Sequence, residues 1–517
     1  MRTVPRWLTV FAILLAGWAV PLPQAQAGNP AAPTQQVTGQ PAVPPPTPAL
    51  TALSPSTVAA GSADFTLTVN GSGFVGSSVV RWNGSDRPTT YLSSTTQLNA
   101  AISAADVAGG GPFSVTVFTS SGGTSSPITL TLYARVGHDT IADTVQGQPN
   151  FTVNNTNNPL MPAAAQLNQP YGLAVDAHTG RLFVADTENN RVLSWPNVVA
   201  QANGQAADLV IGQPNVISHT ANTNGISASS LNFPTGVAVD AQGRLYVADA
   251  GNNRVLEYTA PLTSDMAANG VFGQGGSFTT TAVLPVTAAS LRGPFGVALD
   301  TQGRLYVTDN GNNRVLGYDT PLTSTTAQRV FGQGGSFTTN TANQGGLGPA
   351  SLKGPTGVAL DTQGHLYVAD WENNRVLEYT TPLTSTTADQ VFGQPNFTSG
   401  NYNITGIVTP SANSLYRPLG VAVEAQGSLY VADSFNMRVL EYDTPLTTDT
   451  TADRVFGQGG SFTTTAVLPV TAASMFGPAG VALDAPGNLY VADQLDNRVL
   501  EYDAHAPLQL FLPLVRR

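Results

Sequence analysis

Apolar residues alternate with small and polar residues along the stretch from Gly236 to Tyr258, GVAVDAQGRLYVADAGNNRVLEY. Short runs with a period of two, separated by Gly and Asn, are typical of β-strands joined by tight turns. The pattern predicts strands at residues 237–240, 244–249 and 254–258, and the following VFGQ segment predicts a fourth at 271–274. Each strand is short, so the unit folds as a small antiparallel sheet.

The unit recurs six times at a nearly constant spacing. Each copy has a V-[AT]-D triplet and, a few residues later, an arginine followed by Val-Leu. The triplet aspartates lie 63, 60, 61, 63 and 60 residues apart, and they are Asp186, Asp249, Asp309, Asp370, Asp433 and Asp493. Four-stranded units repeated at one period are typical of propeller blades. We therefore predict a six-bladed β-propeller at residues 137–504.

The position of the fourth-strand signature predicts how the ring closes. A Gly-Gln pair marks this strand at Gly147, Gly212, Gly273, Gly332, Gly393 and Gly457. The first pair precedes the first unit and none follows the last. We therefore expect residues 143–148 to supply the outer strand of the sixth blade, which leaves the ring without an open edge.

The six units also form two related sets of three. The first three triplet aspartates map onto the last three with a constant offset of 184 residues. The segment from Val271 to Ser290 is repeated verbatim from Val455 to Ser474. The pattern indicates a duplicated set of three blades.

Residues 51–134 show a different β-pattern. Alternating runs such as Phe65–Val69 and Phe113–Phe118 follow one another at short spacing, which is typical of a sandwich. The segments NGSGF (70–74), VVRWNG (79–84), TQLNAAI (96–102) and SGGTS (121–125) resemble the IPT/TIG family of immunoglobulin-like domains. The resemblance implies a spacer or adhesion module without active residues, and we expect Trp82 to belong to its core. The predicted fold class is all-β, an Ig-like β-sandwich followed by a six-bladed propeller closed by an N-terminal outer strand.

The propeller units resemble the NHL repeat family. The resemblance rests on the P-x-G-[VL]-A-[VL]-[DE] segment, the V-[AT]-D triplet, the N-x-R step and the V-F-G-Q strand. The period of about 60 residues is longer than is usual for the family. The resemblance implies a protein- or RNA-binding module, with amidating lyases and metal-dependent lactonases among relatives of similar shape. A shared fold does not choose among these functions.

Composition and the chain ends indicate an exported protein. Net charge is −11 and only 10% of residues are charged, which argues against nucleic-acid binding. Residues 1–27 resemble a bacterial export signal with an A-x-A cleavage site, and no second apolar run is long enough to span a membrane. A Pro-rich linker is expected at 28–50, and the apolar tail at 505–517 has no assigned role. The chain has no cysteine, so burial must stabilise it without disulfides. We expect it to be secreted or on the cell surface.

Residues present in every blade are expected to serve the blade. The triplet aspartates and the later arginines are therefore interpreted as structural pairs, with a ring of carboxylates around a cation as the alternative. No catalytic or metal-binding residue and no cofactor is predicted, although a divalent cation in the channel stays open. The five histidines do not converge on expected inner strands, which argues against an amidating-lyase zinc site. These histidines are His138, His178, His219, His365 and His505.

Residues that differ between blades are the candidates for function. Aromatic and charged residues of this kind fall on one face, formed by the second-to-third turns and the fourth-to-first connections. The predicted binding residues are Tyr171, Glu188, Arg292, Phe295, Lys353, Trp371, Glu372, Arg417 and Phe435. Exposed aromatics with a few charges suit an extracellular protein, peptide or glycan partner. Three alternatives stay open: aromatics that only cap the ring, a metal-dependent lactonase- or amidating-lyase-like hydrolase or lyase, and a structural surface or matrix component.

Overall fold

The structure is a computed structural model that describes residues 47–503, except 55–56, 60–64, 93–94, 104–105, 107–111, 121, 134–139, 159–162, 197–201, 408, 426, 444 and 446–449. The expected export signal, most of the expected linker, the tail, His138 and His505 lie outside the described residues. None of the described residues forms a helix that is long and apolar enough to span a membrane.

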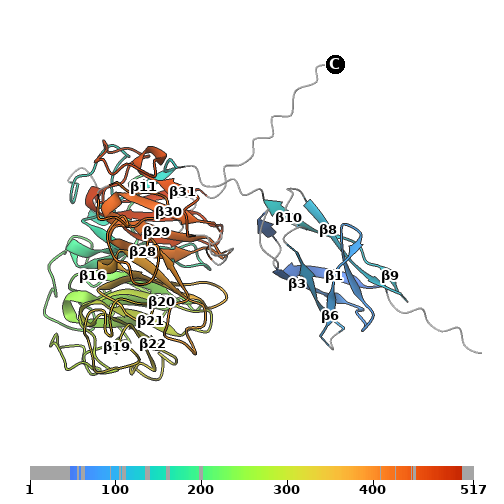
Figure 1. Ribbon diagram of the computed structural model, residues 1–517, viewed down its shortest axis with the longest axis horizontal. Helices are drawn as coiled ribbons and strands as arrows, with labels where there is room; N and C mark the ends of the chain where they lie inside the picture. Colours follow the sequence, from blue (N-terminus) through green and yellow to red (C-terminus); the bar gives the residue numbers. More distant parts are fainter. Residues whose placement is uncertain are drawn as a thin grey trace, which may run out of the picture. The chain divides into compact units, whose positions relative to one another are not determined.

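The N-terminal domain consists of two β-sheets (Figure 1). One sheet has the strand order β1-β3-β7-β6, and the other has the order β2-β10-β8-β4-β5 with β9 paired to β8. The strands are β1 (Ala49–Ser54), β2 (Thr57–Ala59), β3 (Phe65–Ser72), β4 (Val79–Trp82), β5 (Ser85–Asp86), β6 (Thr89–Tyr91), β7 (Gln97–Ile102), β8 (Pro112–Thr119), β9 (Gly123–Thr124) and β10 (Ile128–Tyr133). Alternate residues such as Leu67 and Val69 are fully buried, and Trp82 is 2% exposed, so its assignment to the core is confirmed.

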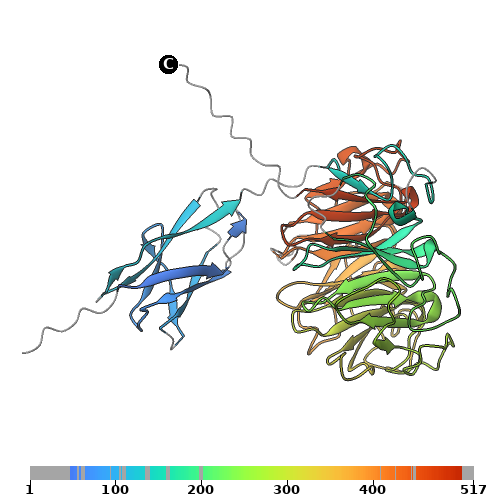
Figure 2. The same ribbon diagram turned by 180° about the vertical axis from the view of Figure 1, so that it is seen from behind.

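The rest of the described chain forms six four-stranded antiparallel sheets, which are the blades (Figures 1 and 2). The strands of each blade are given from the innermost outward. The first blade contains β12 (Pro170–Val175), β13 (Leu182–Asp186), β14 (Arg191–Trp195) and β15 (Leu209–Ile211), the second contains β16 (Pro234–Val239), β17 (Leu245–Asp249), β18 (Arg254–Tyr258) and β19 (Gly270–Phe272), and the third contains β20 (Pro294–Leu299), β21 (Leu305–Asp309), β22 (Arg314–Tyr318) and β23 (Arg329–Phe331). The fourth blade contains β24 (Pro355–Leu360), β25 (Leu366–Asp370), β26 (Arg375–Tyr379) and β27 (Gln390–Phe392), the fifth contains β28 (Pro418–Val423), β29 (Leu429–Asp433), β30 (Arg438–Tyr442) and β31 (Arg454–Phe456), and the sixth contains β32 (Pro478–Leu483), β33 (Leu489–Asp493), β34 (Arg498–Tyr502) and β11 (Thr144–Gln146).

The sixth blade confirms the predicted closure. Its outermost strand, β11, pairs antiparallel with β34, with Val145 opposite Leu500. The two ends of the propeller chain therefore share one sheet, as Figure 1 shows where β11 lies beside the red C-terminal strands. The result is an all-β propeller preceded by an immunoglobulin-like module, as the sequence predicts.

Glycines on the innermost strands allow the blades to meet around the axis. A Cβ atom on Gly172 would lie 2.4 Å from the carbonyl oxygen of Thr235 in the second blade. Each equivalent glycine meets a carbonyl of the next blade, and a Cβ on Gly480 in the sixth blade would lie 2.1 Å from the carbonyl oxygen of Tyr171 in the first. Such approaches exclude any side chain, so these six glycines fix the packing of the inner ring.

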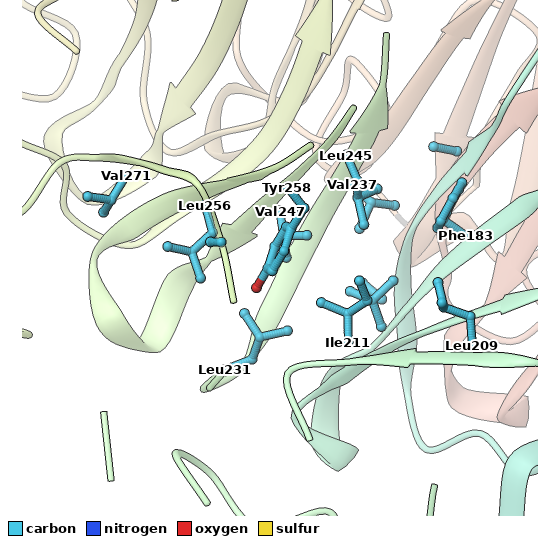
Figure 3. Packing of buried hydrophobic residues seen from close by; sticks show 14 residues of the cluster. Phe183, Leu209, Ile211, Leu231, Val237, Leu245, Val247, Leu256, Tyr258 and Val271 are labelled. Carbon is cyan, nitrogen blue, oxygen red and sulfur yellow. The ribbon is translucent and has the colours of Figure 1, made fainter. Parts of the chain in front are cut away.

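Each pair of neighbouring blades encloses its own apolar core. Figure 3 shows the core between the first two blades, where Phe183 and Ile211 pack with Leu245, Val247 and Tyr258. Equivalent clusters lie at the other five boundaries, including the boundary between the sixth and first blades. Burial of apolar surface at every boundary stabilises a ring that has no disulfides.

Several strand limits in the second blade differ from the expectation by one to three residues, and two of them differ most. The first strand of the second blade begins at Pro234, because a bulge between Pro234 and Val237 lets Pro234 pair with Asp249. The fourth strand covers Gly270–Phe272 and ends before Gly273, whose φ of 102° is left-handed and ends the extended backbone. We call the end of the blades that carries the second-to-third turns the upper face, and the opposite end the lower face.

Candidate functional site

The upper turns share one backbone shape. The second and third strands are joined by a single turn of 3₁₀-helix, and the next residue is left-handed, with φ between 53° and 56°. These turns are η3 (Thr187–Asn189), η5 (Ala250–Asn252), η6 (Asn310–Asn312), η7 (Trp371–Asn373), η8 (Ser434–Asn436) and η11 (Gln494–Asp496). Asparagine tolerates the left-handed conformation, and five of the six turns use it there.

A buried ion pair holds each upper turn. In the third blade, the Arg314 Nε lies 2.7 Å from Asp309 Oδ2, and both side chains are fully buried. The same carboxylate accepts hydrogen bonds from the Asn312 amide and the Arg292 backbone N–H. Burial raises the pKa of Asp309, while Arg314 and the two hydrogen bonds act in the opposite direction. Pairs with the same geometry occur in all six blades.

The arginine of each pair also holds the long connections of the upper face. Arg314 donates from its Nη atoms to the carbonyl oxygens of Phe337 at 2.8 Å, Thr287 at 2.9 Å and Ser290 at 2.9 Å. Ser290 and Phe337 belong to the connections before and after the third blade. The repeated aspartates and arginines therefore form the scaffold of this face. In the third blade both carboxylate oxygens of Asp309 accept hydrogen bonds within this scaffold, so the aspartate is not directed to a ligand.

A cavity of about 560 Å³ lies on the upper face, and we call it the aromatic cavity. Its lining includes Tyr171 and Phe295 from innermost strands and Trp371 and Phe435 from 3₁₀ turns. The other lining residues are Asn310, Thr356, Leu419, Ser434, Met437, Phe476, Gly477, Gln494 and Leu495. The axial channel, by contrast, encloses only about 70 Å³ between the innermost strands. Ligand-sized space therefore lies above the ring.

The aromatic side chains of the cavity are held by neighbours. The rings of Tyr171 and Phe295 meet edge to face at 5.5 Å between centroids. Gln494 donates a 2.8 Å hydrogen bond to the Tyr171 hydroxyl, and burial raises the pKa of Tyr171. Phe435 is 44% exposed, which is unusual for so large an apolar side chain.

Arg417 connects two of these aromatics. Its guanidinium carbon lies 4.6 Å from the centroid of Trp371 and 4.9 Å from the centroid of Phe435, distances at which cation–π attraction operates. Arg417 itself adopts a left-handed φ of 52°. A non-glycine residue in this conformation is uncommon, so the backbone here is held by its surroundings.

The remaining predicted binding residues do not line the cavity. Lys353 and Glu372 form an exposed ion pair, with Nζ 3.0 Å from Oε2. Glu188 lies exposed on η3, and Arg292 lies exposed ahead of β20. The structure thus brings together Tyr171, Phe295, Trp371 and Phe435, with Arg417 stacked against two of them. The other four predicted residues do not line the cavity.

Met437 breaks the pattern of the upper turns and lines the cavity. In the other five blades, an asparagine at this position accepts a hydrogen bond from the backbone N–H of the residue preceding the next innermost strand. Met437 has no amide oxygen, and it holds a left-handed φ of 55°. Left-handed backbone costs roughly 1–2 kcal/mol for such a residue. Strain of this kind is concentrated at functional sites.

The lower face offers polar groups but no metal site among the described residues. His365 Nδ1 lies 2.6 Å from Asp361 Oδ2, and His178 is exposed in another lower turn, whereas His219 is exposed on the upper face, in the connection between the first and second blades. Within the described part of the chain, no three His, Cys, Asp or Glu side chains are grouped so that they could hold a metal ion.

Sequence reasoning missed much of the cavity lining, including Phe476, Gln494 and Leu495. Gln494 and Leu495 occupy the first two positions of η11, the same variable positions that hold Trp371 and Phe435 in other blades. A column of variable residues in the 3₁₀ turns is therefore the signal that could have found them.

Comparisons with known proteins agree with this architecture. The family model of the NHL repeat matches residues 167–193, 231–258, 291–318 and 352–379, and that of the IPT/TIG domain matches residues 48–132. The chain is 28% identical over 376 residues to human NHL repeat-containing protein 2, covering 67% of this chain and 48% of that protein. It is 22% identical over 283 residues to mouse Teneurin-1, covering 52% of this chain and 10% of that protein. The chain thus spans about half the length of NHL repeat-containing protein 2.

Among solved structures, a protein of unknown function from Bacteroides thetaiotaomicron aligns over 90% of this chain and 100% of its own, with 15% identity and a TM-score of 0.43. A streptogramin B lyase aligns over 69% of this chain and 97% of its own, with 13% identity and a TM-score of 0.37. The matches to the NHL repeat fall on the first four blades. The fifth and sixth blades have the same strand order as these four and the same buried Asp–Arg pair. The chain therefore contains four matched NHL repeats in its propeller and an IPT/TIG domain ahead of them.

Proposed function

We propose that the protein is an exported binding protein that captures an apolar segment of a partner protein or peptide in the aromatic cavity, without covalent chemistry. The observation that carries this proposal is the cavity of about 560 Å³ that side chains from several blades line on the upper face. Its size lies within the range of roughly 300–1,000 Å³ that is common for ligand sites.

The chemistry of the lining supports binding rather than proton transfer. The residues that line the cavity are aromatic, aliphatic or neutral polar, and none of them is a histidine, aspartate, glutamate, lysine or arginine. General acid–base catalysis works best with a group whose pKa lies near the working pH, and Tyr171, the one titratable side chain in the lining, has a pKa raised above its ordinary value of 10.0 by burial. A largely apolar pocket with a few amides, such as Asn310 and Gln494, suits an apolar side chain flanked by peptide groups.

The chemistry also favours a peptide over a glycan. A sugar presents many hydroxyl groups, and burying them without hydrogen bonds is costly. The lining has few polar groups, whereas Arg417 and the Lys353–Glu372 pair supply charges outside it that could meet a polar peptide flank. Buried aromatic anchors surrounded by polar groups are typical of protein-binding hot spots.

We also propose that the protein is exported, on the basis of the sequence pattern of residues 1–27. We propose cleavage after Ala27, a linker at 28–50, an IPT/TIG module at 51–134 and a propeller at 137–504, followed by the tail at 505–517. Mass spectrometry of protein secreted by a bacterial host tests this, with a mature N-terminus at Gly28 expected. Retention of residues 1–27 on a cell-bound product would contradict cleavage.

The binding proposal is tested by selecting displayed random peptides on the full chain. We expect the wild-type protein to enrich peptides that contain aromatic or large aliphatic residues. The double variant Trp371→Ala, Phe435→Ala should lose this enrichment and keep nearly the same melting temperature, since both residues line the cavity and Phe435 is exposed. Leu383→Ala is the matched control because Leu383 is 43% exposed on the lower face of the same blade as Trp371.

Two outcomes would overturn the proposal. If the double variant loses several kcal/mol of stability, on the scale of a core aromatic, these residues cap the ring. If the purified protein holds a stoichiometric divalent metal and the selected peptides do not bind it, the competing proposal of a metal-dependent hydrolase or lyase is favoured.

A further inference from the structure

One cross-strand position varies among the blades at their lower end. The fourth residue of the third strand faces the first residue of the fourth strand in each sheet. The six facing pairs, in blade order, are Ser194–Leu209, Glu257–Gly270, Gly317–Arg329, Glu378–Gln390, Glu441–Arg454 and Glu501–Thr144.

The second and fifth blades give the sharpest comparison, because the duplication relates them by 184 residues. In the fifth blade, the Arg454 guanidinium lies 2.7 Å from the Glu441 carboxylate and forms an ion pair. In the second blade the glutamate is kept as Glu257, but Gly270 replaces the arginine. The following segment, Val271 to Ser290, is identical to its counterpart. The second blade therefore has the carboxylate without the guanidinium.

A cavity of about 540 Å³ lies where the missing side chain would be, and we call it the Gly270 cavity. Glu257 and Arg244 contribute polar walls, Phe278 contributes an apolar wall, and residues 321–325 of the third blade close one side. At the next blade boundary, Arg329 occupies the position equivalent to Gly270. Its Nε donates to the carbonyl oxygen of Leu383 in the connection equivalent to residues 321–325. Replacement of that arginine by glycine therefore explains the open space.

Glu257 has no cationic partner among the described side chains. Glu257 is only 8% exposed, and its Oε1 atom accepts a 3.0 Å hydrogen bond from the Thr259 hydroxyl. Oε2 lies on the Gly270 side, 2.9 Å from where a Cβ of that residue would be. Arg244 is held elsewhere, because its Nε lies 2.7 Å from Asp240 Oδ2. A buried carboxylate without a paired cation is costly unless something binds it.

We propose that the Gly270 cavity binds a guanidinium group, presented by an arginine side chain of a peptide, in the place that Arg454 fills in the fifth blade. A planar guanidinium can pair with both oxygens of a carboxylate, which an ammonium cannot do. The apolar wall at Phe278 and the pocket's volume accommodate the aliphatic stem and neighbouring peptide groups. The Glu257 end of this site lies at the lower end of the second blade, and the site shares no lining residue with the aromatic cavity.

Ligand-observed NMR with the full chain tests the proposal, using Nα-acetyl-L-arginine amide as the probe. We expect the arginine probe to bind, its lysine analogue to bind more weakly and its neutral citrulline analogue not to bind. Glu257→Gln should weaken binding by roughly tenfold or more, since it keeps the shape and removes the charge. Gly270→Arg should abolish binding because it supplies the guanidinium from the protein itself.

The Gly270→Arg chain is expected to fold. Gly270 does not have a left-handed φ, and the atom nearest to a new Cβ is the mobile end of Glu257. Glu441→Gln is the matched control, since it changes the same register position in a blade whose arginine is present, and it should leave probe binding unchanged. The proposal is overturned if the wild-type chain does not bind the arginine probe, if citrulline binds equally well, or if Glu257→Gln binds as tightly as the wild type.

Discussion

The substitution Arg314→Ala measures what a buried Asp–Arg pair contributes to a blade. The Arg314 side chain pairs with Asp309 and donates to three carbonyl oxygens of the connections on either side of the third blade. Arg304 in the same blade provides a matched comparison, because it pairs with Asp300 at 2.6 Å on the lower face and is 22% exposed. The two arginines differ in burial and in the loops they hold.

The expected magnitude follows from burial. Removing one partner of a buried pair leaves an uncompensated charge and typically costs about 3–5 kcal/mol. Asp309 would keep its bonds from the Asn312 amide and the Arg292 backbone N–H, so we expect about 4 kcal/mol. The Asp300 side chain is only 1% exposed, but it keeps hydrogen bonds from the backbone N–H groups of residues 302 and 304 when Arg304 is replaced by alanine. Water can also reach the place of the partly exposed guanidinium, so we expect Arg304→Ala to cost about 1 kcal/mol.

Differential scanning calorimetry of the full chain provides the measurement. The entropy of unfolding is about 2.1 cal/mol/K per residue, so over roughly 360 propeller residues a loss of about 4 kcal/mol lowers Tm by about 5 °C. Arg304→Ala should lower Tm by about 1 °C. Equal shifts for the two variants would refute the view that buried pairs hold the upper turns.

The pH dependence of the Arg314→Ala defect gives a second check. Arg314 is the largest influence that lowers the pKa of Asp309 against the effect of burial. Without it the folded-state pKa rises further, and a carboxyl group with a raised pKa loses stability as pH increases through that pKa. The deficit in Tm should therefore be larger at pH 8 than at pH 5. A deficit that grows toward low pH would contradict an ionised Asp309 as its cause.

Three further predictions concern other parts of the ring. Burial raises the pKa of Glu378 from 4.5 to about 7, so the contribution of this side chain to stability is present at low pH and is lost as pH rises through 7. Glu378→Gln should therefore leave stability nearly unchanged at pH 5 and raise it by about 2 kcal/mol at pH 8. Equal shifts of the urea unfolding midpoint at the two pH values would contradict this. Met437→Asn should relieve left-handed strain and provide an acceptor for Gly477, raising stability by about 1–2 kcal/mol while weakening capture of selected peptides; unchanged capture would show that Met437 is not part of the site. Deleting residues 137–150 removes β11, including the fully buried Val145, and should lower the melting temperature by many degrees, whereas an unchanged melt would contradict closure by this strand.

The sequence predicted the propeller because its blades repeat both an apolar pattern and a turn. The alternating pattern and the Gly-Gln pairs indicated four strands in each unit. Because the first Gly-Gln pair comes before the first unit, the order of these pairs along the chain also predicted that the outer strand of the sixth blade comes from the N-terminal side. The bulge after Pro234 was missed because it depends on how the innermost strand pairs with Asp249. Strand limits set by pairing are not visible in an alternating pattern.

The candidate sites were predictable to different degrees. Trp371 and Phe435, which line the aromatic cavity, could be proposed from the sequence because they are aromatic residues at variable positions. Gln494 was missed because an amide in a turn looks like an ordinary surface residue until its hydrogen bond to Tyr171 is seen. The Gly270 cavity required the strand register, since only the pairing of Gly270 with Glu257 shows that a side chain is missing there.

The upper turns explain how a repeated scaffold can display different side chains. Each turn is fixed by groups within and below it, namely the aspartate before it, the arginine after it and the polar residue at its third position. The first two positions of the turn take no part in that network in the third blade. They hold Asn-Gly in η6 but Trp-Glu in η7, Ser-Phe in η8 and Gln-Leu in η11, while the residues just before and just after each turn have nearly the same backbone angles in all four blades. Residues at these positions therefore differ between blades while the buried network stays the same, although a Cβ on Gly311 would lie 2.7 Å from the Arg292 carbonyl oxygen and would require a small shift there. The ring thus presents a variable surface at one end on a constant interior.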